Sequence, residues 1–115
     1  MRDYLLFYVN GIRHQISGER GFQSLSEFLR GDLGLVGTKV VCAEGDCGSC
    51  TVLIGRVRNS VMCYEGINSC IQYLYQLDCA HVITVEGLKD ETKKIHPVQK
   101  AMIDTLGSQC GYCTP

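Results

Sequence analysis

The order of hydrophobic and polar positions predicts a strand hairpin at the start of the chain. Residues 4–9 are aromatic and aliphatic enough for a strand, and Asn10-Gly11 follows, which is a strong short signal for a tight hairpin turn. Apolar and polar positions then alternate over residues 12–16, as they do in a half-buried strand. We expect these two strands to pair, with His14 at the surface.

A helix and a second group of strands follow the hairpin. Ser24 and Glu27 form the pattern of a capping box, and apolar residues recur at helical spacing until Gly34. Further strands are expected at residues 51–54, 57–62, 71–75 and 81–85, with a turn at Gly55-Arg56 between the first two. This order of elements predicts an α+β fold, and a β-grasp arrangement fits it.

The pattern changes after Glu86. Residues 87–95 are charged and lack apolar periodicity, which is typical of a linker. Pro97 then stands at a first helical position, and apolar residues recur every three or four positions until Gly107. We therefore expect two units, one formed by residues 1–86 and a second, helical one that begins with residues 87–115.

Composition excludes several classes of function. The formal net charge is −1, from 11 basic and 12 acidic residues, and no basic stripe suited to nucleic acid is present. The apolar run near the start is too short to cross a membrane. Eight cysteines without a secretory signal are typical of a reducing compartment, where such clusters more often serve metal or redox chemistry. We expect a cytoplasmic protein that binds neither nucleic acid nor membrane.

Three cysteines share a short glycine-rich segment, CAEGDCGSC. Cys42, Cys47 and Cys50 are separated by four and then by two residues, which is the spacing of plant-type iron–sulfur proteins with a distant fourth cysteine. The residues between them are mostly small, so they leave room for a cluster. Glycines also allow positive φ, which lets backbone N–H groups point at the sulfurs and stabilise an anionic cluster. The segment therefore predicts a 2Fe-2S site.

The fourth thiolate has three candidates. Cys70 is preferred because turn-forming residues precede it, whereas Cys63 and Cys79 are expected to remain unligated. The same segment could instead hold zinc in a zinc-stabilised β-grasp binding module, although structural zinc sites usually combine two separated ligand pairs. Disulfides are disfavoured because the chain lacks an exporting context.

Nothing in the sequence predicts bond-making chemistry. Ser, His and Asp residues do not form a recognisable triad, and no glycine-rich phosphate loop is present, so no catalytic residue is expected. Electron transfer remains, and a free-standing plant-type ferredoxin is one candidate. Free carriers tend to be strongly acidic, so the small net charge argues against that candidate.

Three stretches closely resemble the iron–sulfur subunit of the molybdenum hydroxylases: GTKVVCAEGDCGSCTVLIG, INSCI and SQCGYCTP. HPVQKAMIDTLGSQCGYCTP is most similar to the small subunit of bacterial xanthine dehydrogenases. The resemblance implies a ferredoxin-like β-grasp domain and then a helical-bundle domain, each with one 2Fe-2S cluster. It also implies an oxidoreductase in which electrons pass from a molybdopterin-bound molybdenum through both clusters to FAD. Those two cofactors would be held by partner domains or subunits, and this chain alone would not be catalytic.

The resemblance also assigns residues. Cys110 and Cys113 match two of the four ligands of the helical-domain cluster, and the other pair lies beyond Pro115, so we expect an incomplete second site here. Gln109 matches a glutamine that hydrogen-bonds the pterin of the molybdenum cofactor. Val41 stands where the family often has glycine, and a β-branched residue makes a positive φ costly. The ligands of the ferredoxin-type cluster match Cys42, Cys47, Cys50 and Cys70.

Overall fold

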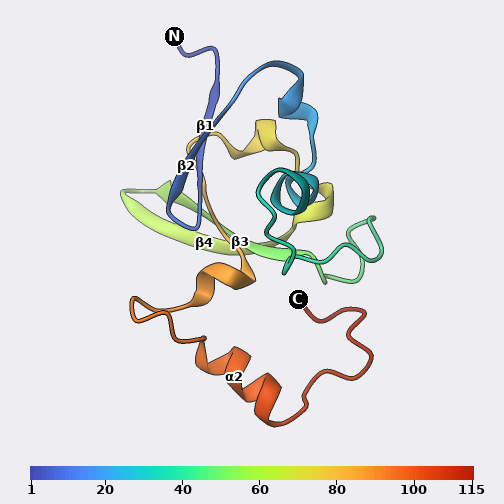
Figure 1. The fold of residues 1–115 in the computed structure, drawn as a ribbon. Coiled ribbons are helices and arrows are strands. Elements are labelled where there is room, and N and C mark those ends of the chain that lie inside the picture. The colour runs from blue at the N-terminus through green and yellow to red at the C-terminus, as the bar shows by residue number, and fades with distance from the viewer.

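The computed structural model describes all 115 residues and contains one five-stranded mixed sheet (Figure 1). The strands lie in the order β2-β1-β5-β3-β4. The neighbours β1 and β5 are parallel, and every other neighbouring pair is antiparallel. The strands are β1 (Leu5–Val9), β2 (Ile12–Ile16), β3 (Thr51–Arg58), β4 (Val61–Asn68) and β5 (His81–Ile83).

The first hairpin forms as predicted. Asn10 and Gly11 both have positive φ, at 50° and 84°, as a tight two-residue hairpin turn requires. His14 differs from the prediction, because it is half-buried rather than at the surface. Its ring lies 6.0 Å from the ring centroid of Phe7 and 5.5 Å from that of Phe28, so the alternating strand places it beside the aromatic core.

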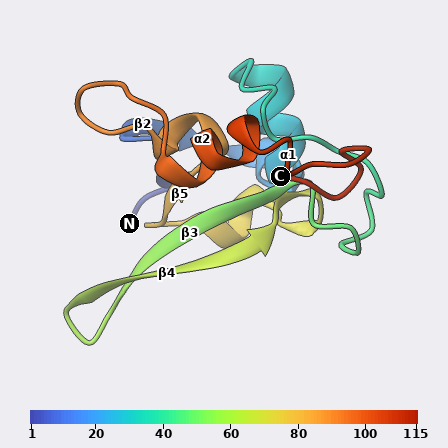
Figure 2. The same ribbon diagram turned by 90° about the horizontal axis from the view of Figure 1, so that it is seen from below.

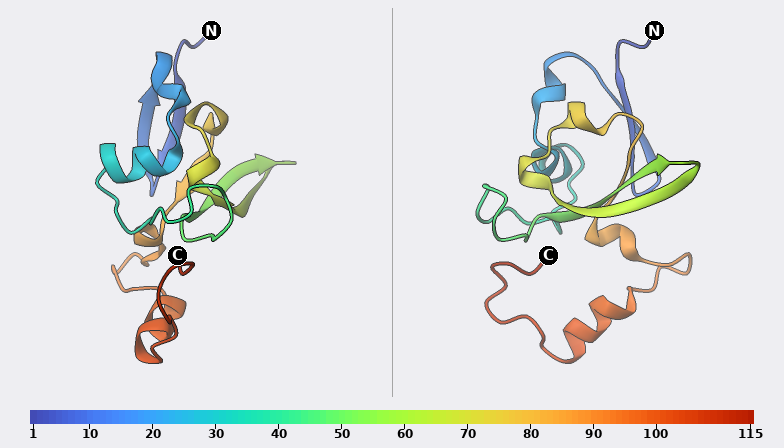
Figure 3. Two further views of the ribbon diagram at one scale, coloured as in Figure 1. Left: turned by 90° about the vertical axis from the view of Figure 1, so that its right-hand side faces the viewer. Right: turned by 180° about the vertical axis from the view of Figure 1, so that it is seen from behind.

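The predicted helix lies beside the sheet (Figure 3). The backbone N–H of Glu27 donates to Ser24 Oγ at 3.2 Å, which caps α1 (Leu25–Glu27). The helix continues as a π-helical turn (Phe28–Asp32), and Gly34 follows with φ of 67°. Its apolar side joins the core, which consists of Phe7, Val9, Ile16, Leu25, Phe28, Leu29, Val52, Ile54, Leu74, Leu77, Ala80 and Val82.

The second hairpin is longer than predicted, and the turn expected at Gly55-Arg56 is wrong. The strand β3 continues through both residues, and the chain reverses at Asn59 and Ser60, whose φ values are 50° and 64°. Gly55 serves a different purpose: a Cβ there would lie 2.4 Å from a ring carbon of Tyr64 on β4. Figure 2 shows this twisted hairpin extending along one side of the molecule.

The strand expected at residues 71–75 is also wrong. Two short 3₁₀ helices, Ser69–Ile71 and Leu74–Leu77, occupy this region, and a single bridge joins Ser24 to Tyr73. The apolar pattern arises instead because Leu74 and Leu77 are fully buried against the core. Two further 3₁₀ helices, Gly18–Phe22 and Val85–Leu88, precede the helix and follow β5.

The last part of the chain lies below the sheet in Figure 1. The helix α2 (Pro97–Asp104) begins at the predicted proline, and His96 Nδ1 accepts a hydrogen bond from Val98 N at 3.1 Å. None of its residues is buried. No helix in the structure has the length and apolar character that crossing a bilayer requires. A mixed sheet with few helices confirms the α+β prediction.

Candidate metal centre

The segment that carries three of the cysteines connects the π-helical turn to β3, and its first residues are held firmly. Arg30 Nη1 donates to the carbonyl oxygens of Val36 at 2.8 Å and Thr38 at 3.0 Å. The backbone N–H of Gly37 donates to Glu86 Oε2 at 2.9 Å, and a Cβ at Gly37 would lie 2.8 Å from that carboxylate. A fixed entry limits the conformations open to the cysteine loop.

The sheet register brings Cys50 and Cys70 together. Thr51 at the start of β3 pairs with Asn68 at the end of β4, so Cys50 and Ser69 are neighbours. Ser69 donates to the Cys50 carbonyl oxygen from its backbone N–H at 3.3 Å and from its hydroxyl at 2.7 Å. Burial raises the pKa of Cys70, and a hydrogen bond with the Cys50 thiol raises it further.

The loop folds its backbone around the sulfur of Cys42. Three N–H groups donate to this sulfur, from Glu44 at 3.5 Å, Asp46 at 3.4 Å and Cys47 at 3.3 Å. These donors lower the pKa of Cys42 to about 6, because they stabilise the thiolate. The loop is thus arranged to stabilise negative charge on sulfur.

Positive φ in this loop falls on Ala43 rather than on the residue before Cys42. Ala43 has φ of 56°, followed by Gly45 at 79° and Gly48 at 80°. Val41 does not have positive φ, so the cost expected at this β-branched residue does not arise. Alanine bears the unfavourable conformation more easily than valine because it is not branched at Cβ.

Two polar residues that the sequence did not single out complete the loop. Ser49 is buried, its N–H donates to Cys47 Sγ at 3.4 Å, and its hydroxyl lies 3.2 Å from the same sulfur. Asn68 Nδ2 donates to the Gly45 carbonyl oxygen at 2.8 Å and ties the loop to β4. Neither residue type has a distinctive spacing, so only the folded register reveals these roles.

The four cysteines are arranged as two neighbouring pairs, Cys42 with Cys47 and Cys50 with Cys70. The backbone N–H of Cys47 donates to Cys42 Sγ at 3.3 Å, and the sheet register sets Cys50 beside Ser69, the residue before Cys70. No group of three or more His, Cys, Asp or Glu side chains is gathered to hold a single metal ion. A binuclear cluster makes a different demand, because its four thiolates are divided between two irons. Two neighbouring cysteine pairs match this demand.

The remaining cysteines lie apart from these four. Cys63 is exposed on β4, where it pairs with Arg56 of β3, and Cys79 is exposed near Arg2. Cys110 and Cys113 are exposed in the loop that follows α2. Gln109 is also exposed, in the same loop. The residues predicted for the second site therefore form a group separate from the cysteines of the first site.

The loop after α2 nevertheless approaches the first site. Lys39 Nζ donates to the carbonyl oxygen of Gly111 at 3.1 Å. Partial desolvation raises the pKa of Tyr112, and the negative charges of Cys47 and Cys42 raise it further. The loop that carries Cys110 and Cys113 is therefore near the cysteine loop.

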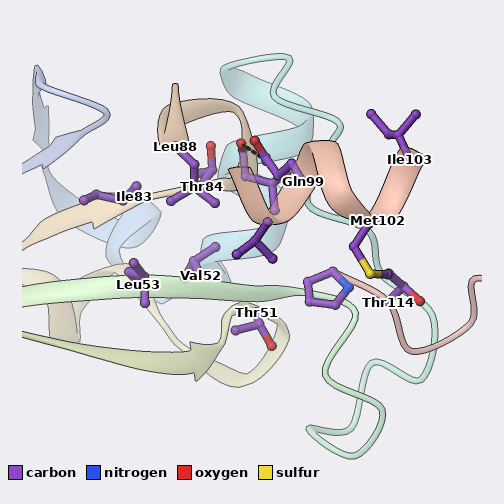
Figure 4. Close-up of a pocket in the computed structure, with 13 residues that line it drawn as sticks. Thr51, Val52, Leu53, Ile83, Thr84, Leu88, Gln99, Met102, Ile103 and Thr114 are labelled. Carbon is purple, nitrogen blue, oxygen red and sulfur yellow. Dashed lines mark hydrogen bonds between the residues drawn. The ribbon is translucent and has the colours of Figure 1, made fainter. Parts of the chain in front are cut away.

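The largest cavity lies where α2 faces the sheet (Figure 4). Its volume is about 610 Å³, and its lining is mostly apolar, with Leu53 and Ile83 on the sheet and Met102 and Ile103 on the helix. None of the candidate cysteines lines it. The cavity therefore lies between the two predicted units.

Two family matches divide the chain. Residues 7–75, more than half of it, match the family described as the 2Fe-2S iron–sulfur cluster binding domain. Residues 84–115 match a second family, described as a 2Fe-2S binding domain. Xanthine dehydrogenase 1 of Arabidopsis thaliana is 42% identical over 112 residues, which are 96% of this chain and 8% of that protein.

Solved structures give the same result. An aldehyde oxidoreductase from Desulfovibrio gigas has a TM-score of 0.74 at 33% identity, and the match covers 97% of this chain and 11% of that one. Quinoline 2-oxidoreductase from Pseudomonas putida has a TM-score of 0.71 at 29% identity, with 96% of this chain and 62% of that chain covered. The chain spans less than a tenth of the length of the curated relatives it matches. It belongs to the 2Fe-2S iron–sulfur cluster binding family, and these relatives confirm the predicted resemblance to the iron–sulfur part of molybdenum hydroxylases.

Proposed function

We propose that this chain is the electron-transfer component of a molybdenum hydroxylase of the xanthine dehydrogenase type. The observation that supports the proposal is the arrangement of Cys42 beside Cys47 in the loop and of Cys50 beside Ser69 and Cys70 through the sheet register. When bound, 2Fe-2S clusters accept and release single electrons and would link substrate oxidation at molybdenum to FAD. These four cysteines would hold the first cluster.

The rest of the loop would tune that cluster. Three N–H donors on the Cys42 sulfur, and the N–H and hydroxyl of Ser49 at the Cys47 sulfur, stabilise negative charge there. Hydrogen bonds to cluster sulfurs and their ligands shift the reduction potential upwards, because the reduced cluster carries more negative charge. The buried Ser69 contact on the Cys50 carbonyl oxygen fixes the backbone that joins Cys50 and Cys70.

Residues 87–115 are proposed to begin the domain that holds a second cluster. The family match from residue 84 onwards and the helix start at Pro97 support this boundary. Cys110 and Cys113 would provide two ligands, and Gln109 would face the pterin of the molybdenum cofactor. The partners would be a molybdenum-binding subunit and an FAD-binding domain or subunit, in the reducing cytoplasm that the eight free cysteines favour.

The relay is tested in the enzyme that contains this chain. Cys47→Ser removes one ligand of the first cluster, and Cys63→Ser removes an exposed thiol outside the site as a matched control. Under anaerobic conditions with substrate, we expect Cys47→Ser to abolish flavin reduction, followed by absorbance, while reduction at molybdenum, followed by electron paramagnetic resonance, persists. Cys63→Ser should behave as the wild type. Unchanged flavin reduction in Cys47→Ser would contradict the relay.

A further inference from the structure

Only two hydrogen bonds join residues 96–115 to the first 86 residues. Gln99 Nε2 donates to the Val85 carbonyl oxygen at 2.8 Å, close to the linker. The other is the bond from Lys39 Nζ to the Gly111 carbonyl oxygen, which joins positions 72 residues apart. The loop after α2 therefore depends on Lys39 for its polar contact with the cysteine loop.

The position of Lys39 is set by its neighbours. Glu86 binds the backbone N–H of Gly37, and Arg30 binds the carbonyl oxygen of Thr38. Thr38 is buried and Lys39 is half-buried, so the lysine leaves the loop from a fixed backbone. Such a lysine loses less conformational freedom on forming its hydrogen bond than a freely exposed one does.

The hydrogen bond between Lys39 and Gly111 joins the regions of the two cysteine motifs. Lys39 lies three residues before Cys42, and Gly111 lies between Cys110 and Cys113. Gly111 has φ of 84°, a conformation that L side chains rarely adopt. A shift of either loop would thus change the separation of the two sets of thiols.

We propose that Lys39 is a positioning residue that fixes the C-G-Y-C loop against the first cluster and so sets the distance between the two iron–sulfur sites. The inference rests on the proposed function, because it presumes a cluster at the first site. The ammonium group also brings a positive charge to the C-G-Y-C loop.

The chain contains no tryptophan, which allows a clean optical test. Tyr112→Trp places an indole in the C-G-Y-C loop, and a nearby coloured cluster quenches its emission with a steep dependence on distance. In the cluster-loaded chain we expect strong quenching. Adding Lys39→Met, which keeps the side-chain length but removes the donor, should raise the emission severalfold, whereas Lys39→Arg should keep it quenched.

The matched control is Lys89→Met. It removes the same charge from an exposed lysine that makes no hydrogen bond or ion pair, and it should leave the emission unchanged. Without the cluster, all variants should emit alike. Equal quenching in Lys39→Met and the parent, at equal iron content, would overturn the role of Lys39 but leave the proposed function intact. A chain that binds no iron would overturn both.

A second measurement uses the complete enzyme with both clusters. Lys39→Met should weaken the magnetic interaction between the two reduced clusters and slow electron transfer between them, and Lys39→Arg should restore both. A variant with both clusters, an unchanged magnetic interaction and an unchanged rate would contradict the inference.

Discussion

At the scale of single residues, the first site depends on a left-handed backbone conformation that most side chains disfavour. The turn around Cys42 needs positive φ at Ala43 and Gly45, which directs several N–H groups to one sulfur. Left-handed backbone costs a residue with a Cβ about 1–2 kcal/mol. Glycine avoids this cost, and the small residues of CAEGDCGSC follow from it.

Two glycines in the loop provide a matched comparison. Gly45 and Gly48 have nearly equal φ, at 79° and 80°. A Cβ at Gly45 would also lie 2.8 Å from Ile71 Cδ1, whereas at Gly48 the nearest atom is Thr51 Oγ1 at 3.5 Å. We expect Gly48→Ala to shorten the lifetime of the cluster in air and Gly45→Ala to shorten it more, followed by loss of visible absorbance. The reverse order would contradict this assignment.

His14 gives the fold a pH dependence. Burial lowers its pKa below the ordinary value of 6.5, because the charged ring is poorly solvated beside Phe7 and Phe28. The stability that the neutral ring contributes to the fold is therefore fully present above pH 6.5. It is lost as pH falls through the lower pKa that the ring has in the folded state. The thermal midpoint should drop as pH falls below 6.5, and His14→Phe should reduce the drop. An equal drop in the variant would exclude His14 as its source.

At the scale of elements, the pairing of β3 with β4 does most to build the site, because it sets Cys50 beside Ser69 and Cys70. The cysteine spacing, the first hairpin and both helix starts could be predicted from sequence, since each depends on neighbours along the chain. The position of the β3–β4 turn could not be predicted. Gly55 indicates a turn in the sequence, but in the structure it leaves room for the ring of Tyr64. The contacts of Ser49 and Asn68 arise only from the folded register.

The β3–β4 turn suggests a stabilising change. Ser60 has φ of 64°, and Asn59 precedes it, so Ser60→Gly creates the Asn-Gly pair that two-residue hairpins favour. Relief of the left-handed backbone should raise the free energy of unfolding by about 1 kcal/mol. The thermal midpoint should rise by several degrees, with iron content unchanged. A lower midpoint would show that the serine side chain contributes more than its strain costs.

At the scale of the whole molecule, the chain carries four cysteines proposed to bind the first cluster and two proposed for a second cluster. The first four lie in the loop before β3 and just after β4. Cys110 and Cys113, in contrast, are exposed beside a helix with no buried residue. The apolar cavity between α2 and the sheet adds to this loose contact between the two units. We therefore expect one cluster in this chain, at the first site.

Metal and acid-labile sulfide analysis of the anaerobically prepared chain tests this claim most directly, with Cys70→Ser as the ligand variant and Cys63→Ser as its control. We expect about two irons and two sulfides per wild-type chain and per Cys63→Ser chain, and a brown colour in both. Cys70→Ser should lose most of the iron, sulfide and colour. A colourless wild-type chain that is folded and binds zinc, or a Cys70→Ser chain with its full iron content, would contradict the account.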